Sequence, residues 1–445
     1  MKKKLLAAVL SAAMAASLLA GCGGSTSGST ASGTASSDSG SASEASGTET
    51  ADSGEVQEIT WMFWDDLTAT EDLISKGYAD VIERFNKDYE GKYHVTPITT
   101  NLEEYYTKLN ALVASGDTPD VFIVSPGPNL TDYVEPGVAA PLDSYLADGW
   151  KDTFTSDAVF SQMTYDGQIY AVPLNIAAAC AFYNTEMFEA AGAEVPKTWD
   201  EMIAACDKLQ AAGYTPITIS AGTAWCLSMV AGYLCEMEGV DLAALADGSA
   251  SWTDGKLASA AEKLVQLSQY FQKTAAGDTN DVATANFYNG EAAILIQGSW
   301  AIAQINGSNP DFESKCGVFQ FPGVERVIAK SDSLAMSSST KNPEACIALM
   351  KYFTDDTAQK YTAEVGGKIP VTNVEYDASV APAQLSYVMD VFSNATGTFG
   401  FYNESMPSTE AGAFFDDSMV SVFLGDMTPE EAATGMEDFY ASNCR

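Results

Sequence analysis

Aromatic and carboxylate side chains stand together at the ends of several apolar runs. Asp65 and Asp66 follow Trp64 at the end of the run 59–64, and Trp300 follows a Gly-Ser pair at the end of another run. A flat aromatic ring can cover the C–H face of a sugar ring, and a carboxylate accepts hydrogen bonds from its hydroxyls. These residue types therefore indicate noncovalent binding of a small, hydroxyl-rich molecule.

Each of these residues also has a structural explanation. Trp64, Trp300 and Trp225, which lies in a Gly-Thr-Ala-Trp loop, are also compatible with core packing. Asp65 or Asp66 is also placed to cap the helix that helical spacing predicts from Asp72 onward. We expect ligand contacts from Trp300, Asp65, Asp66, Trp64 and Trp225, with core packing and capping as the alternatives.

Several kinds of reaction chemistry have no support in the sequence. His94 is the single histidine, which excludes a multi-histidine zinc site and a histidine-based catalytic triad. There is no CxxC pair and no GxxxxGK[ST] motif, so we expect neither a metal nor a nucleotide, and no cofactor. Carboxylates beside aromatic rings also equip glycoside hydrolases, so a secreted glycosidase stays open as an alternative.

The first residues predict export and lipid attachment. Three lysines precede the uncharged apolar run 5–20, which is typical of a signal peptide over residues 1–21. The run ends in Leu-Ala-Gly and Cys22, the pattern of a cysteine that receives a diacylglyceryl group. Residues 22–54 are mostly Ser, Gly, Thr and Ala, which predicts a disordered tether. We therefore expect a protein held by lipid on the outer face of the cell membrane.

The remainder has the composition of a folded protein. The chain is 46% hydrophobic and 11% aromatic, and some 390 residues after the tether favour two lobes over one. Its formal charge of −38 excludes nucleic acid and anionic lipid as partners. Seven cysteines remain after Cys22, and a bridge between Cys226 and Cys235 stays open.

Short apolar runs alternate with helical spacing along this part. Strands are expected at 59–64, 94–98, 120–124, 177–183, 216–219 and 292–296, and helices at 72–89, 105–113, 199–212 and 257–272. This alternation predicts an α/β fold with largely parallel sheets covered by helices. Ligands bind at the carboxyl ends of such strands, where Asp65, Asp66 and Ser125 fall.

Six short motifs follow one another along the chain. Residues 116–121 (GDTPDV) are similar to GxxPDV, and residues 166–173 (DGQIYAVP) to DGKxYxxP. The block from 183 to 202 is similar to YNKxxFxxAG followed by PxTWxE. Residues 287–300 are similar to FxxGxAAMxxxGxW, and residues 366–370 (GGKIP) to a late GxxP crossover. In this order the six motifs resemble the extracellular solute-binding proteins of ABC transporters, the family of maltose-binding protein.

The resemblance implies a two-lobed periplasmic-binding-protein-like fold with hinge crossovers and a central cleft. Lobe 1 would comprise 55–172 and 322–369, and lobe 2 would comprise 173–321 and 370–445. Trp300 matches the family position whose indole stacks on sugar, and Trp225 lies where relatives contribute aromatics. Further ligand contacts are expected, more weakly, from Ser125, Asn175, Glu404, Phe414 and Phe415, and from the pair Asp416 and Asp417.

The resemblance also implies the activity. A monomer would capture a sugar, favoured as an oligosaccharide, and deliver it by lobe closure to the permease subunits of an ABC transporter, without enzymatic activity. The named loop ends carry no Arg or Lys, which favours a neutral sugar over a phosphate ester. Another small solute, such as a polyol or a peptide, stays the alternative.

Overall fold

The computed structural model describes residues 56–68 and 72–444. The predicted signal peptide, Cys22 and all of the predicted tether lie outside the described residues. The first sheet has the strand order β2-β1-β3-β12-β6. Its members are β1 (Gln57–Phe63), β2 (Tyr93–Thr99), β3 (Val121–Val124), β6 (Ala171–Pro173) and β12 (Ser333–Met336).

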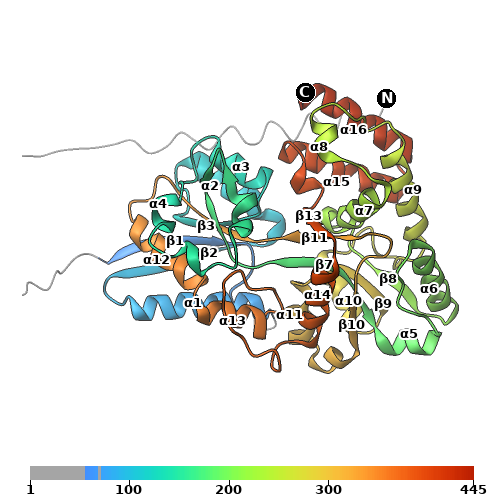
Figure 1. Cartoon of the computed structure of the whole chain (residues 1–445), viewed down its shortest axis with the longest axis horizontal. Helices are drawn as coiled ribbons and strands as arrows, with labels where there is room; N and C mark the ends of the chain where they lie inside the picture. Colours follow the sequence, from blue (N-terminus) through green and yellow to red (C-terminus); the bar gives the residue numbers. More distant parts are fainter. Residues whose placement is uncertain (1–55, 69–71, 445) are drawn as a thin grey trace, which may run out of the picture. The chain divides into compact units, whose positions relative to one another are not determined.

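Helices cover this sheet, and their ends follow from local sequence. Asp72 caps α1 (Leu73–Asp88) by accepting from the backbone N–H of Ile74. α2 (Leu102–Ser115) ends at Gly116, which has a φ of +83°. From far along the chain, α12 (Pro343–Phe353) packs against both α1 and β1, and α13 (Asp356–Glu364) against α1 (Figure 1). The predicted helices at 72–89 and 105–113 are confirmed.

The second sheet has the order β13-β11-β7-β9-β8, with β10 paired to β7. Its strands are β7 (Ala177–Asn184), β8 (Thr215–Thr218), β9 (Ala292–Gly298), β10 (Cys316–Phe319), β11 (Arg326–Lys330) and β13 (Gly397–Phe399). All residues of β9 are buried, as its continuous apolar run predicts. The helices that surround this sheet include α5 (Thr185–Ala191), α6 (Trp199–Ala211), α7 (Ala224–Glu238), α9 (Lys256–Ser268), α10 (Asn280–Tyr288), α11 (Ala301–Ser308), α14 (Ala383–Asn394), α15 (Thr409–Leu424) and α16 (Pro429–Asn443).

The expectation of largely parallel sheets is only partly right. β1 pairs in parallel with β2 and β3, and β8 with β9. β12 and β7, however, run antiparallel to the strands beside them in their sheets. These two strands receive the chain directly from the other sheet instead of through a βαβ crossover, so the handedness rule for parallel connections does not apply to them.

The chain passes between the sheets at three places. Residues 174–176 join β6 to β7, residues 331–332 join β11 to β12, and Ile369 forms a bridge to Ile176. β11 pairs with β7 and β13, so it belongs to the second sheet, although the predicted lobe 1 includes 322–330. That boundary is wrong for this strand, because its pairing partners lie in the second sheet. The remaining lobe boundaries stay a prediction.

Two large hydrophobic cores and a smaller third one fill the fold. One core surrounds the first sheet, and the second lies among β7, β9, α7, α9, α15 and α16. Cys235 is a buried free thiol, so it does not bridge to Cys226. Among the described residues, no helix combines the length and the apolar character that a membrane span requires.

Candidate ligand-binding site

A cavity of about 260 Å³ opens where residues of both sheets meet. Pro126 and Gly127 line it just beyond β3 of the first sheet, and Ala329 and Lys330 line it from β11 of the second. The other lining residues come from the segments 161–165 and 400–405: Ser161, Gln162, Thr164, Tyr165, Gly400, Phe401, Glu404 and Ser405. Of the predicted site residues, only Glu404 is among the residues that line this cavity. Ser125 is the residue before Pro126, which does line it.

Three aromatic rings from distant segments form a cluster beside this cavity. Trp225 and Trp300 lie 5.8 Å apart with an interplanar angle of 67°, and Phe401 lies 6.0 Å from Trp300 and 6.1 Å from Trp225. Both tryptophans are only partly buried, whereas Phe401 lines the cavity. We call Trp225, Trp300 and Phe401 the aromatic wall. The structure brings the two predicted tryptophans together, and sequence reasoning missed Phe401.

The end of β9 sets the position of Trp300. A Cβ at Gly298 would lie 2.1 Å from Cζ3 of the Trp300 ring, so the indole can lie back on the strand only because residue 298 has no side chain. Its Nε1 is buried and has no hydrogen-bond acceptor in the described part of the chain. An unpaired buried N–H is costly, and a ligand oxygen would satisfy it.

Lys330 connects the two sheets at the cavity. Its Nζ donates to Ser125 Oγ and to Glu404 Oε1, both at 3.2 Å, and lies 5.4 Å from the centre of the Phe401 ring. Burial alone would lower the pKa of Lys330, but Glu404 and Asp332 raise it above its ordinary value. The structure therefore brings Ser125 and Glu404 together, because both accept hydrogen bonds from the ammonium group of Lys330. Sequence reasoning missed Lys330.

The loop ends named from the sequence carry no Arg or Lys, but Lys330 reaches the cavity from a strand that the sequence does not indicate. The sequence feature that could have indicated Lys330 is the apolar run Val327 to Ala329, because such a run is typical of a strand, which here would end at Lys330. The run is short and follows the Pro-Gly turn at 322–323, so the sequence does not predict a strand there. Because Glu404 neutralises this ammonium, the pair leaves no net charge for an anionic ligand.

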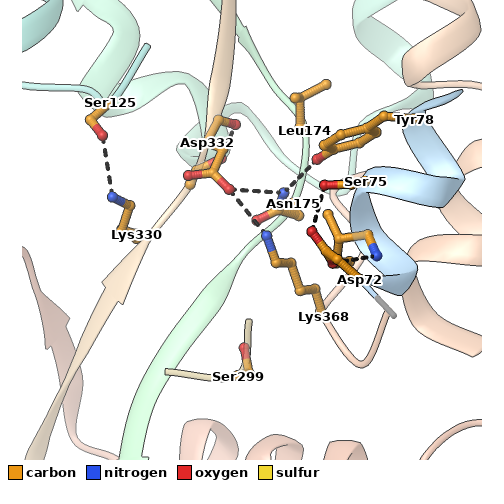
Figure 2. Close-up of polar contacts among 12 residues, drawn as sticks. Asp72, Ser75, Tyr78, Ser125, Leu174, Asn175, Ser299, Lys330, Asp332 and Lys368 are labelled. Atoms are coloured by element: carbon orange, nitrogen blue, oxygen red, sulfur yellow. Dashed lines mark hydrogen bonds and ion pairs between the residues drawn. The ribbon is translucent and has the colours of Figure 1, made fainter. Parts of the chain in front are cut away.

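The crossovers between the sheets carry a second polar cluster (Figure 2). Lys368 Nζ donates to Asp332 Oδ2 at 3.1 Å, and Asn175 Nδ2 lies 3.5 Å from the same oxygen and 3.4 Å from the Tyr78 hydroxyl. Burial alone would raise the pKa of Asp332, but Lys368 and Lys330 hold it below its ordinary value.

Asn175, predicted as a ligand contact, keeps an unused acceptor in this cluster. Its side chain is 1% exposed, and its Oδ1 has no donor among the described residues. The neighbouring Asp332 carboxylate requires a donor, so the amide must turn Nδ2 toward it and leave Oδ1 unpaired.

Trp64, Asp65 and Asp66, the three residues predicted as ligand contacts at the end of β1, have different surroundings in the structure. Trp64 is 9% exposed and packs edge-on against Tyr105 at 5.3 Å, so it belongs to the first core. Asp66 is exposed and accepts from the hydroxyl and the backbone N–H of Thr68. Trp64 thus packs in the first core and Asp66 stabilises a turn, and their contact with a ligand stays a prediction.

Asp65 is different, because its surroundings disfavour charge. Burial raises its pKa well above the ordinary value, and Asp72 and Asp281 raise it further, while Lys368 lowers it. A carboxyl group in this state can both donate to and accept from a ligand hydroxyl.

The two late phenylalanines lie away from the cavity. Phe415 is fully buried and lies 6.0 Å from Tyr402, and Phe414 stacks on Phe439 of α16 at 4.8 Å. Neither ring lines the cavity, and both pack on the second core, so their contact with a ligand stays a prediction without support from this cavity. The late aromatic of the wall is Phe401, which comes earlier in the chain.

These features were compared with known proteins. Residues 80–385 match the family model described as bacterial extracellular solute-binding protein. An uncharacterised ABC transporter extracellular-binding protein of Pyrococcus horikoshii is 26% identical over 295 residues, which are 65% of this chain and 66% of that relative. A multiple sugar-binding protein of Streptococcus mutans is 28% identical over 66% of this chain and 73% of its own length.

A probable sugar-binding periplasmic protein of Rhizobium meliloti is 26% identical over 81% of this chain and 90% of its own. Among solved structures, a chitin oligosaccharide binding protein superposes with a TM-score of 0.80 at 23% identity, covering 88% of this chain and all of that one. A maltose-bound protein of T. maritima superposes with a TM-score of 0.74 at 20% identity, covering 87% of this chain and all of its own. These structures share the fold. The family match spans well over half of the chain, and the protein belongs to the bacterial extracellular solute-binding proteins.

Proposed function

We propose that this protein captures a sugar and delivers it to the permease of an ABC transporter. The observation that carries the proposal is the aromatic wall of Trp225, Trp300 and Phe401 beside a cavity edged by Glu404 and Lys330. The partly exposed rings of Trp225 and Trp300, with the buried Phe401 ring that lines the cavity, supply a surface for the apolar face of a sugar, and the ion pair supplies donors and acceptors for its hydroxyls. The names of the Streptococcus and Rhizobium relatives support the same ligand class.

The charges favour a neutral sugar. Lys330 is paired with Glu404, and Lys368 with Asp332, so neither ammonium is available to a phosphate or a carboxylate without breaking an existing pair. An anionic ligand would also approach Glu404 directly.

Lobe closure is the proposed route of capture. The chain crosses between the sheets at three places, and Lys330 of the second sheet donates to Ser125 at the end of the first. A ligand favours the closed state only through contacts that the open state lacks. A sugar held between the aromatic wall and the segment around Ser125 would supply them. We expect the closed monomer to dock on its permease.

Export and anchoring are proposed from the first 54 residues. A lipid on Cys22 would keep the protein on the outer face of the membrane, and two acyl chains are needed for stable attachment. Metabolic labelling with a radioactive fatty acid should mark the wild-type protein, and Cys22→Ser should abolish the label. Equal labelling of both would rule out this anchor.

Binding is tested by thermal denaturation with a panel of glucose, xylose, maltotriose, xylotriose, raffinose, glucuronate and glycerol 3-phosphate. Any true ligand raises the melting temperature by mass action. A neutral sugar should give the largest rise. A rise with glycerol 3-phosphate alone would replace sugar by another solute.

We also propose that the protein is not an enzyme. Incubation with reducing-end-labelled maltotriose and xylotriose should return both unchanged. Release of labelled shorter products would support the glycoside hydrolase alternative instead.

A further inference from the structure

Asp416 of α15 holds two other elements through one carboxylate. Its Oδ1 accepts from Ser228 Oγ of α7 at 2.5 Å, and its Oδ2 accepts from Asn403 Nδ2 of the short helix η4 (Asn403–Ser405) at 3.0 Å. The close approach depends on Gly412, because a Cβ there would meet the backbone oxygen of Asn403 at 2.3 Å.

Both elements carry parts of the candidate site. Trp225 lies in the first turn of α7, one turn before Ser228, and Phe401 precedes η4 with only Tyr402 between them. Asn403 Oδ1 also accepts from the backbone N–H of Glu404 at 3.0 Å. Asp416 therefore lies between the segment that supplies Trp225 and the segment that supplies Phe401 and Glu404, without lining the cavity itself.

We propose that Asp416 is a positioning residue that holds Trp225 in register with Phe401 and Glu404, and so sets the geometry of the aromatic wall. This inference rests on the proposed function, because it assigns the wall to ligand binding.

The hydroxyl hydrogen of Ser228 couples Asp416 to the backbone of Trp225. The Ser228 hydroxyl has one hydrogen and two acceptors within reach, Asp416 Oδ1 at 2.5 Å and the backbone oxygen of Trp225 at 3.3 Å. An ionised Asp416 accepts that hydrogen in a charge-assisted bond. A protonated Asp416 can donate to Ser228 Oγ instead, which frees the Ser228 hydrogen for the Trp225 carbonyl. The protonation state of Asp416 thereby changes the hydrogen bonding of the turn that bears Trp225.

The surroundings of Asp416 place this change in the neutral range. Burial raises its pKa to about 7, against the bonds from Ser228 and Asn403, which lower it. The charges that raise it further are Glu404 of η4 and Asp417 of its own helix, while α7 faces it with the neutral Ser228. Glu404 itself is paired with Lys330.

The test needs no ligand. The full-length protein is labelled with 5-fluorotryptophan, and the ¹⁹F signal of Trp225 is assigned by its loss in Trp225→Phe. As the pH is raised, the chemical shift of this signal in the wild type should change in one step with a midpoint near pH 7. Asp416→Asn should abolish this pH-dependent step. Ser228→Ala leaves Asp416 in place and should remove most of the step. Asp417→Asn is the matched control on the exposed neighbour and should keep it.

A Trp225 signal that does not titrate in the wild type would overturn the proposal, and so would an unchanged step in both Asp416→Asn and Ser228→Ala. Because no sugar is present, failure of the sugar assignment would leave this result unaffected. The wild type and Ser228→Ala decide the matter even where Asp416→Asn fails to fold.

Discussion

The ring of Trp225 stands edge-on to the ring of Trp300, with 5.8 Å between their centres and 67° between their planes. The two residues come from the start of α7 and the end of β9, 75 positions apart, and Phe401 adds a third ring. The partly exposed rings of Trp225 and Trp300, packed with the buried ring of Phe401, form a surface for an apolar ligand face at a small cost in side-chain entropy.

Replacing Trp300 should separate binding from folding. Trp300→Ala should weaken binding of the sugar by at least about 30-fold, the effect of losing a central aromatic contact of 2 kcal/mol or more. The melting temperature should stay near that of the wild type, because the side chain is only partly buried. Titration calorimetry and thermal denaturation measure the two effects.

Trp252→Ala is the matched control for this change. Trp252 is 1% exposed within the second core, so its removal should lower the melting temperature while the folded fraction keeps its affinity. If Trp300→Ala behaved in the same way, with a large loss of stability and unchanged affinity, Trp300 would be a core residue.

Gly298 should matter through the ring of Trp300. Gly298→Ala places a Cβ against the indole, so the ring must move and affinity should fall by about tenfold or more. At Gly277 an added Cβ would meet only Thr274 O, at 4.0 Å, so Gly277→Ala should bind normally. Equal affinities of the two variants would show that the observed ring position is not the binding position.

How far the sequence predicts this site depends on the kind of signal. β9 and Trp300 were predicted because an apolar run ends in a Gly-Ser turn, and both signals are local. Trp64 follows a similar run and yet lies in the core, because the fold packs Tyr105 of α2 against it. Phe401 belongs to the site because it packs near Trp300, and Lys330 because it donates to Ser125. In both pairs the two residues are over 70 positions apart in the sequence, and no local sequence pattern indicates such a contact. The sequence predicts the strand β7 but not its antiparallel direction, and it misses β12, for the same reason.

Glu404 should determine the tolerated ligand charge. Glu404→Gln keeps the shape but leaves the Lys330 ammonium without its carboxylate. The Kd for glucuronate relative to that for glucose should fall by roughly tenfold, because the cavity then offers an uncompensated cation. Calorimetric titrations of both sugars give the ratio. An unchanged ratio would mean that Lys330 does not contact the ligand.

Asp416 should make stability depend on pH. Its pKa in the folded protein is about 7, above its ordinary value, so its contribution to the free energy of unfolding is fully present below about pH 4 and is lost as the pH rises through 7. Asp416→Asn does not titrate. Between pH 4 and pH 8 the wild type should therefore lose up to about 4 kcal/mol relative to this variant. Urea unfolding at both pH values measures the difference, and parallel losses in the two proteins would contradict it.

A crystal structure of the protein with the sugar that gives the largest thermal shift tests the central claim most directly. We predict that a sugar ring packs on Trp300 or Trp225, with hydroxyls hydrogen-bonded to Glu404 or Lys330. A sugar bound elsewhere, with the three rings still packed only on one another, would contradict the assignment of this cavity.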